Sequence, residues 1–331
     1  MFALNRRHAA LLATAVAAVM GLTLVAGPAA AKTTLRLGHG LAKGHPVDVS
    51  LDEFAKLVRE RSKGELDIKV FPAGQLGQQR ELIEQMQNGA LDLVHANASP
   101  LAAFEPSFGV YDMPFLFRDN DHFFKVVEGA VGDEVLASSR AKAFVGLAYY
   151  DNGTRSFYAN KPLAKPEDLK GLKVRVQPGP IATRMINLLG ATATPLAWGE
   201  VYTALQSGVV DGAENNVTAL TLARHGEVMK VYTRDEHTRV PDVVLVATAT
   251  LDRLKPEQQE LLRQAARDSA KAHNARWAAE LEKAEGEAAK MGVKFVDADK
   301  AAYRQVVQPM YDDLKATPAL ATLADRIQAV K

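Results

Sequence analysis

The chain has 331 residues, of which 47% are hydrophobic and 24% are charged, and its formal net charge is +1 at pH 7. This is an ordinary globular composition, sufficient for one large or two small lobes, and it excludes a strongly basic surface for nucleic acid or acidic membranes. The absence of cysteine excludes disulfides, thiolate catalysis, cysteine-bound metal and a lipid anchor on cysteine.

Residues 1–31 have the pattern of a secretory signal peptide. Arg6 and Arg7 give a basic start, an apolar run follows, and alanines at 29–31 form a small-residue cleavage site. An uncleaved membrane anchor is the alternative, but the small residues favour cleavage after Ala31. No other apolar run approaches the ~20 residues that span a bilayer. We therefore expect export to a bacterial periplasm, with no membrane anchor on the mature protein.

The first part of the mature chain alternates strand and helix patterns. Strands are expected at 35–39, 66–71 and 91–96, with helices at 46–64 and 79–88 between them. This order is the half-unit of an open parallel sheet, an α/β arrangement. Ligands of such sheets bind outside the carboxyl ends of the strands, which here are marked by His39, Phe71 and Asn97.

The chain is expected to cross into a second lobe after Gly153 and to return near Pro241. The predicted first lobe comprises 32–153 and 241–280, and the second comprises 154–240 and 281–331. Two strand crossings between lobes would form a hinge.

Residues 254–291 form one very long helical pattern, which Pro256 opens and Gly292 ends. About 36 residues rising ~1.5 Å each span roughly 50 Å, which is too long for one small lobe. A break in the helix and a coiled coil are the alternatives, and the alanine-rich stripe lacks the sustained heptads of a coiled coil. We expect one helix that lies across both lobes.

The segment 168–216 is predicted to carry the binding chemistry. Val174 and Val176 alternate with polar neighbours, which places Arg175 in the middle of a short strand, on the face opposite the valines. A covered mid-strand arginine is costly unless it pairs with a carboxylate, and its planar fork suits bidentate recognition of one. The spacing alone leaves open an arginine on a solvated strand face.

Motifs of catalysis are absent from the sequence. It contains no Gly-x-Ser-x-Gly, no P-loop, no dinucleotide fingerprint and no paired histidine zinc motif. We therefore expect no enzymatic activity, no cofactor and no metal. His39 at a strand end is a candidate ligand contact, whereas His45 is expected to be hydrogen-bonded or solvated. Asn215 can donate and accept hydrogen bonds, with a plain turn residue as the alternative.

Six short pieces, in order along nearly all of the mature chain, resemble the solute-binding proteins of TRAP (tripartite ATP-independent periplasmic) transporters, DctP type. They are Phe-Pro-Ala-Gly-Gln-Leu-Gly at 71–77, Asn-Gly-Ala-Leu-Asp at 88–92, Asn-Gly-Thr-Arg at 152–155, Leu-Lys-Gly-Leu-Lys-Val-Arg-Val at 169–176, Trp-Gly-Glu-Val-Tyr-Thr-Ala-Leu-Gln at 198–206 and Val-Asp-Gly-Ala-Glu-Asn at 210–215. The resemblance implies a two-lobed periplasmic-binding-protein-like fold that hands a small organic acid to the small and large subunits of a membrane permease.

The resemblance also implies roles for individual residues. Arg175 would clamp the solute carboxylate, Arg155 and Asn215 would assist, and the aromatic Trp198 would pack on the solute. The corresponding first-lobe positions are His39, Gln79 and Asn97. Sialic-acid members carry a glutamate and an arginine where this chain has Asn97 and Pro100, which disfavours sialic acid.

The solute class is inferred from the uncharged polar side chains. They are Gln79, Asn97, Gln177, Asn215 and Asn216, and they favour hydroxyls beside one carboxylate, as in a hexuronate or an aldonate. The segment 235–242, with His237, resembles sugar-acid binders. Two arginines keep a C4-dicarboxylate open. An ABC-type receptor, a secreted enzyme on a two-lobed scaffold and a receptor that feeds a sensor kinase are the rival functions.

Overall fold

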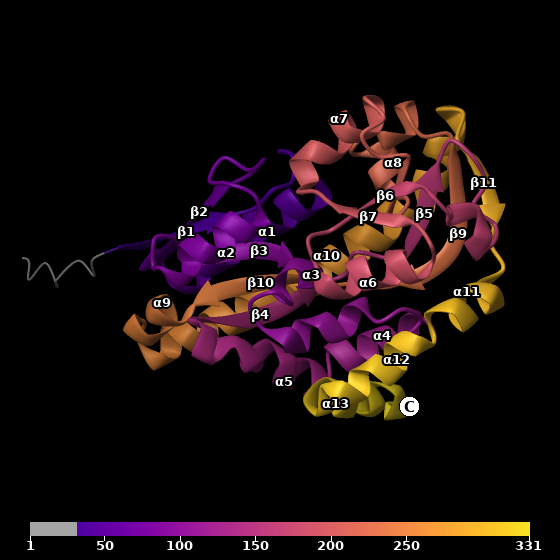
Figure 1. Cartoon of the computed structure of the whole chain (residues 1–331). Helices are drawn as coiled ribbons and strands as arrows, with labels where there is room; N and C mark the ends of the chain where they lie inside the picture. The colour runs from indigo at the N-terminus through magenta and orange to yellow at the C-terminus, as the bar shows by residue number, and fades with distance from the viewer. Residues whose placement is uncertain (1–31) are drawn as a thin grey trace, which may run out of the picture. The chain divides into compact units, whose positions relative to one another are not determined.

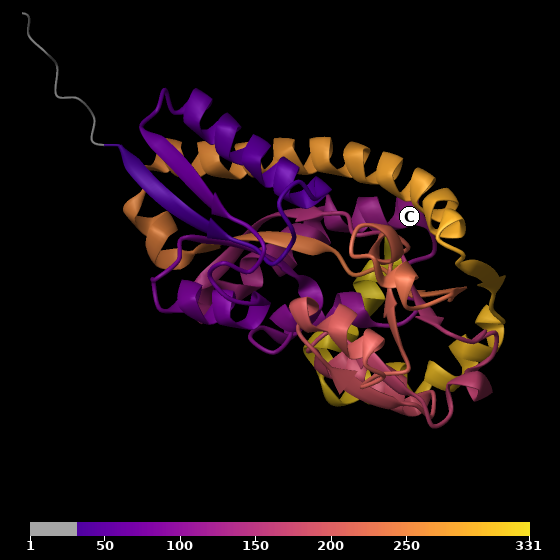
Figure 2. The same cartoon turned by 90° about the horizontal axis from the view of Figure 1, so that it is seen from above.

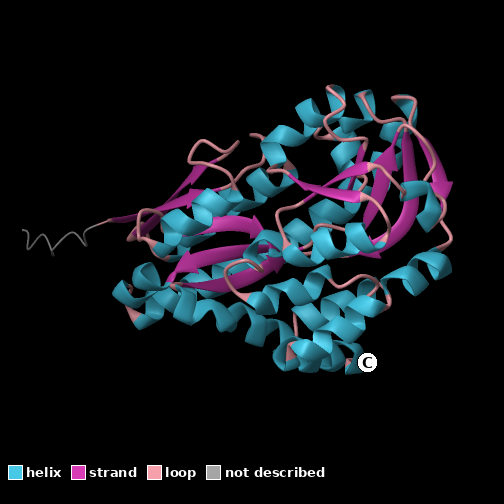
Figure 3. Cartoon of the chain, in the orientation of Figure 1, coloured by secondary structure: helices cyan, strands magenta, loops and turns pink. Residues whose placement is uncertain are grey.

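The computed structural model describes residues 32–331, so the predicted signal peptide lies outside the described residues. Two mixed β-sheets organise the described chain (Figures 1 and 3). The first sheet has the order β2-β1-β3-β10-β4, with β1 (Thr33–Gly38), β2 (Leu66–Phe71), β3 (Leu93–Asn97), β4 (Phe144–Tyr150) and β10 (Asp242–Ala247). The second has the order β11-β9-β5-β8-β6-β7, with β5 (Arg155–Ala159), β6 (Lys173–Val176), β7 (Thr192–Pro195), β8 (Gly212–Asn215), β9 (Val231–Thr238) and β11 (Lys294–Asp297).

Helices pack around both sheets. The α-helices are α1 (Pro46–Arg61), α2 (Gln79–Gln87), α3 (Ala98–Leu101), α4 (Asn120–Val127), α5 (Ala130–Ser138), α6 (Pro180–Leu188), α7 (Val201–Gln206), α8 (Thr218–Thr221), α9 (Thr248–Arg253), α10 (Pro256–Lys290), α11 (Lys300–Val307), α12 (Pro309–Asp313) and α13 (Pro318–Ala329). Short 3₁₀ helices are η1 (Pro106–Asp112), η2 (Ser139–Lys142), η3 (Pro166–Leu169), η4 (Trp198–Glu200), η5 (His225–Glu227) and η6 (Leu314–Ala316).

In the first sheet, the strands β4 and β10 are nearly continuous apolar runs, whereas β1 and β2 alternate apolar and polar residues. β1 pairs in parallel with β2 and β3, as predicted, and β10 runs antiparallel between β3 and β4. Every residue of β4 and β10 is buried, which suits central strands covered on both faces. Helix α1 buries Leu51, Phe54 and Val58 at helical spacing and packs against β2 and α10.

Two short connections join the sheets, which confirms the predicted strand crossings. Residues 151–154 lead from β4 to β5, and residues 239–241 lead from β9 back to β10. Arg239 in the second connection donates to both carboxylate oxygens of Asp151 in the first, at 2.9 Å each, and its guanidinium lies 4.3 Å from the Phe123 ring. A buried bidentate ion pair therefore ties the two connections together.

Helix α10 is the predicted long helix, and it contacts both lobes (Figure 2). Its 35 residues span about 52 Å at 1.5 Å per residue. Near its start, Leu262, Ala265 and Ala266 join the core of the first sheet, and near its end, Ala284 and Ala288 join the core of the second. Small alanine side chains let the helix lie close to both cores.

Some predicted boundaries differ from the structure. The helix expected at 46–64 is α1, which ends at Arg61. The strand expected at 91–96 is β3, which begins at Leu93 and ends at Asn97. The last helix, α13, packs against α5 and η1 of the first-lobe segment, and the residue limits assigned to the two lobes stay a prediction.

The two lobes share a packed seam, where α6 of the second lobe contacts α3 of the first. Gly179, just before α6, lies so close to α3 that a Cβ there would stand 2.4 Å from Ser99 Oγ and 3.0 Å from its carbonyl oxygen. One core cluster runs through this seam and includes Val94 from the first sheet and Val174 from the second.

We expect Gly179→Ala to destabilise the protein by about 1–3 kcal/mol, because the added methyl must separate α3 from α6. Gly286→Ala is the control. Gly286 is an exposed residue of α10, and no atom lies within 4 Å of a Cβ added there. Alanine should therefore raise the free energy of unfolding by about 0.5–1 kcal/mol. Urea unfolding of both variants measures these changes. A Gly179→Ala variant as stable as wild type would show that the seam is not tightly packed.

Candidate functional site

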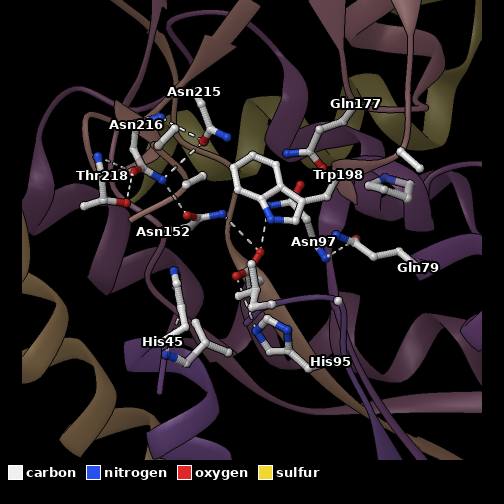
Figure 4. Close-up of a pocket in the computed structure, with 18 of the residues that line it drawn as sticks. His45, Gln79, His95, Asn97, Asn152, Gln177, Trp198, Asn215, Asn216 and Thr218 are labelled. Carbon is white, nitrogen blue, oxygen red and sulfur yellow. Dashed lines mark hydrogen bonds and ion pairs between the residues drawn. The ribbon is translucent and has the colours of Figure 1, made fainter. Parts of the chain in front are cut away.

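A cavity of about 180 Å³ lies between the two sheets (Figure 4). Its lining comes from the carboxyl end of β3, the loops after β1 and β2, the connection at Asn152, the ends of β6 and β8, and the middle of α10. This agrees with the prediction that the site lies beyond the strand ends. Loops at strand ends are free of the sheet hydrogen bonds and can present side chains to a ligand.

The structure brings together seven of the nine predicted contacts. The residues that line the cavity are Arg155, Arg175, Asn215, Trp198, Asn97, Gln79 and Gln177. His39 and His237 are buried elsewhere and do not line it. The individual roles of all nine in solute binding stay predictions.

Arg175 is buried in β6 with only 1% of its surface exposed, so the solvated strand face left open by the spacing is wrong. Its Nε and Nη2 both donate to the Leu196 carbonyl oxygen, at 3.1 and 2.7 Å, and its Nη1 has no hydrogen-bond partner among the described residues. Burial lowers the pKa of Arg175 to about 10, which leaves it charged at neutral pH. Within residues 32–331 no carboxylate forms an ion pair with it.

Arg155 differs from Arg175 because its charge is already paired. Its Nε and Nη2 donate to the two carboxylate oxygens of Glu214 at 2.6 and 2.8 Å, and its Nη1 donates to Asn215 Oδ1 at 2.9 Å. That amide oxygen also accepts from the Asn216 backbone nitrogen at 2.8 Å. Arg155 therefore orients Asn215 so that the amide nitrogen is the group with capacity for a further bond.

His237 lies behind this pair and stabilises it. Its Nδ1 is 2.7 Å from Asp235 Oδ2, its Nε2 is 3.5 Å from Glu214 Oε2, and its ring stacks on Phe157. Burial alone would lower the pKa of His237, but Asp235 and Glu214 raise it to about 9. Burial would likewise raise the pKa of Glu214, but Arg155 and His237 hold it at about 2. The four charges of Asp235, His237, Glu214 and Arg155 cancel.

The first-lobe side of the cavity presents a carboxylate. Asp242 Oδ1 accepts from Asn97 Nδ2 at 2.8 Å and from Asn152 Nδ2 at 3.1 Å, and Oδ2 lies 3.3 Å from His95 Nε2. Burial alone would raise the pKa of Asp242, but His95 and the Asn97 hydrogen bond keep it below its usual value. The cavity therefore has an unpaired cation on one lobe and a hydrogen-bonded anion on the other.

The chain matches the family model described as bacterial extracellular solute-binding protein, family 7, over residues 37–317. The chain belongs to this family. The predicted TRAP solute-binding protein of DctP type is thereby confirmed, and with it a binding protein in place of an enzyme.

Solved structures and a curated relative agree with this assignment. A TRAP periplasmic solute-binding protein from Xanthobacter autotrophicus Py2, with bound β-D-galacturonate, is 39% identical, covers 90% of this chain and 100% of its own, and has a TM-score of 0.87. One from Roseobacter denitrificans, with bound β-D-glucuronate, is 34% identical with the same coverage and a TM-score of 0.88. The C4-dicarboxylate-binding periplasmic protein DctP of Rhodobacter capsulatus is 31% identical over 94% of each chain.

The cavity also contains residues that the sequence analysis did not single out, namely His95, Asp242 and Trp277. His45, which was not expected to contact a ligand, lines the cavity as well. His45 caps α1 by accepting a hydrogen bond from the Val47 backbone nitrogen, as expected of a hydrogen-bonding residue, and its ring lies 5.7 Å from that of Trp277. His45 precedes a helix in a strand-end loop, which is a usable sequence signal. Trp277 lies in the middle of α10, and the helical pattern alone did not indicate which face of that helix lines the cavity.

His39 supports the loop after β1 and does not line the cavity. It is fully buried, its Nε2 is 3.3 Å from Asp48 Oδ1, and its Nδ1 accepts from the Leu41 backbone nitrogen at 3.3 Å. Burial lowers its pKa to about 4.

Along residues 32–331 no helix has the length and apolar character needed to cross a membrane. Nor do the described side chains form a cluster placed to hold a metal ion.

The raised pKa of His237 predicts a loss of stability in mild alkali. The stabilisation from its protonated form is complete below the unfolded value of 6.5 and is lost as pH rises through about 9, an effect of about 3 kcal/mol. His237→Gln should be less stable at pH 6 and should show a flatter stability curve between pH 6.5 and 9.

Urea unfolding across this range measures the slope. His225→Gln is the control, since burial lowers the pKa of His225 to about 4 and it does not titrate in this window. Parallel curves for wild type and His237→Gln would contradict the charge assigned to His237.

Proposed function

We propose that this protein is the periplasmic receptor for a hexuronate, such as D-galacturonate or D-glucuronate, and that it delivers the sugar acid to a TRAP permease of small and large membrane subunits. The observation that carries the proposal is the buried, charged and unpaired Nη1 of Arg175 in a cavity between two lobes. A buried guanidinium without an anion is costly, and a carboxylate is the group that matches its fork.

The rest of the cavity matches a polyhydroxylated body. Asn97, Asn152, Asn216 and Thr218 offer amide and hydroxyl groups, and Asp242 offers carboxylate oxygens that accept hydroxyl protons. The Trp198 ring, 6.0 Å from the Arg175 guanidinium, gives an apolar face on which a sugar ring can pack. The solved relatives that hold galacturonate and glucuronate support the same class of solute.

A C4-dicarboxylate is the second candidate, because the Rhodobacter capsulatus relative binds one. Its second carboxylate would lie on the first-lobe side of the cavity, where Asp242 already holds a negative charge. Like charges in a site of low dielectric repel strongly. Arg155 offers little compensation because Glu214 neutralises it. These contacts favour one carboxylate over two.

We further propose that residues 1–31 are removed after Ala31 on export and that the solute closes the lobes about the connections at 151–154 and 239–241. Solute favours closure only if it contacts both lobes better when they are shut. Contacts from Arg175 on one lobe and Asn97 or Asp242 on the other would supply that difference.

Calorimetric titration of the purified mature protein with D-galacturonate, D-glucuronate, a hexonate, succinate and malate tests the solute class. We expect a hexuronate to bind at least tenfold more tightly than either dicarboxylate. Tighter binding of succinate or malate would overturn the sugar-acid assignment and leave the receptor function intact.

Arg175→Ala should lower hexuronate affinity by a hundredfold to a thousandfold or more. Loss of one partner of a buried charge pair costs about 3–5 kcal/mol, and ~1.4 kcal/mol is tenfold in Kd. Arg175→Lys should restore affinity only partly, since an ammonium lacks the planar fork. Arg184→Ala, which removes an exposed arginine of the same lobe, is the matched control and should bind like wild type.

Melting of each solute-free variant separates binding from folding. Binding by Arg175→Ala within threefold of wild type, or melting far below wild type, would assign Arg175 a structural role.

Asp242→Asn should shift the preference among solutes. The amide keeps the shape of the side chain but removes the negative charge, so hexuronate affinity should fall about tenfold while succinate affinity rises. The loss of one charge-assisted hydrogen bond, on the order of 1.5–3 kcal/mol, sets the scale. Competition calorimetry measures the ratio of the two affinities. An unchanged ratio would exclude Asp242 as a selector against dicarboxylates.

A further inference from the structure

A second, much smaller cavity lies behind the solute cavity, in the seam between the lobes. It measures about 10 Å³, the size that holds about one water molecule. Arg155 and Gln177 line both cavities, so these two side chains separate the solute from the inner space. The polar residues around the inner cavity are Ser99, Asp112, Arg155, Gln177, Glu214 and Thr238.

Three buried polar atoms of these residues lack a hydrogen-bond partner among the described residues. They are Ser99 Oγ, Asp112 Oδ2 and Gln177 Oε1. A carboxylate oxygen and an amide oxygen can only accept, and the single hydroxyl hydrogen of Ser99 can serve only one of them. A proton on Asp112 would supply an additional donor among these side chains, since a carboxylic acid both donates and accepts.

The charges that face Asp112 come from three strands of the second sheet. They are Arg155 on β5, Glu214 on β8 and His237 on β9. Helix α3 adds only the neutral Ser99. The ionisable residues on the other helices packed against η1 or α3 (α2, α5, α6 and α13) are all exposed. They are Arg80, Glu81, Glu84, Asp133, Glu134, Arg184, Asp325 and Arg326. Burial raises the pKa of Asp112 to about 7; Glu214 adds to the rise, and Ser99, Arg155 and His237 oppose it.

We propose that Asp112 is a proton-binding site coupled to the solute cavity, so that the protein takes up a proton at Asp112 when it binds its anionic solute. The inference rests on the proposed function, because the sign of the coupling requires a solute carboxylate at Arg175. Without solute, the buried cations of the second sheet near the cavity are Arg155, Arg175 and His237, and the anions there are Glu214 and Asp235. Asp242 of the first lobe adds a third anion across the solute cavity.

The direction of coupling follows from this charge balance. With Asp112 ionised, four buried anions face three cations, and a solute carboxylate adds a further negative charge. With Asp112 protonated, three anions balance three cations, so the solute carboxylate meets less repulsion. Charges in a cavity of low dielectric interact strongly, so the protonated form should bind the solute more tightly. Solute affinity should therefore fall as pH rises through 7, and acidic surroundings should favour loading.

Calorimetry of the whole mature protein with D-galacturonate in phosphate and in Tris at pH 7.5 measures proton uptake, because the two buffers release different heats on giving up a proton. We expect wild type to take up a substantial fraction of one proton and its Kd to rise severalfold between pH 6 and pH 8. Asp112→Asn, which mimics the protonated side chain, should take up none and should bind with a nearly constant Kd.

Two results would overturn the proposal. One is wild-type binding without proton uptake. The other is uptake that persists in Asp112→Asn, which would place the proton on another group such as His95. If D-galacturonate does not bind at all, the proposed solute is wrong, and a solute-free measurement still decides the state of Asp112.

That measurement is thermal unfolding of the solute-free protein between pH 4 and pH 8. The stability that protonated Asp112 contributes is complete below about pH 4 and is lost as pH rises through about 7. The melting temperature of Asp112→Asn should therefore rise relative to wild type across this range, whereas the exposed control Asp133→Asn should follow wild type. A constant difference between Asp112→Asn and wild type would contradict a titrating Asp112.

Discussion

The structure is arranged around one uncompensated charge, the guanidinium of Arg175. It is held in β6 by the Leu196 carbonyl and covered by Trp198, and its Nη1 has no hydrogen-bond partner among the described residues. A buried charge in such a place is unfavourable unless an anion pairs with it, and we propose that the solute carboxylate is this anion. Arg155 differs from Arg175: it is equally buried, but its Nε and Nη2 donate to the two carboxylate oxygens of Glu214. The same residue type is thus unpaired at one position and part of an internal ion pair at the other.

The two lobes are joined by short connections and by α10. The ion pair of Arg239 with Asp151 ties the two connections, and α10 packs against both sheets. The first lobe lines the cavity with Asn97, Asn152 and Asp242, a set of acceptors and donors with one negative charge. A cation on one lobe and an anion on the other give the cavity a polarity that fits a solute with one carboxylate and several hydroxyls.

The sequence predicted the sheets, the long helix and most of the cavity because these follow from local patterns and from short family pieces. Short strand patterns placed β1, β2 and β3, and Pro256 and Gly292 bounded α10. Other features could not be read from local patterns. His237 contacts Asp235 and Glu214 and does not line the cavity, and its role in solute binding stays a prediction. Trp277 was missed because it meets His45, which is more than two hundred residues away, and no local pattern indicates such a pairing. The burial of Arg175 was open at first for the same reason: a strand pattern does not tell which face its neighbours cover.

The most direct test compares wild type and Arg175→Ala, each titrated with D-galacturonate and with D-galactose, which lacks the carboxylate. This cycle isolates the coupling between the guanidinium and the solute carboxylate. If Arg175 binds the carboxylate, wild type should prefer the acid by at least a hundredfold, about 2.7 kcal/mol, and the variant should distinguish the two sugars by less than about threefold. A variant that keeps a hundredfold preference for the acid would show that another residue binds the carboxylate, and the central claim would be wrong.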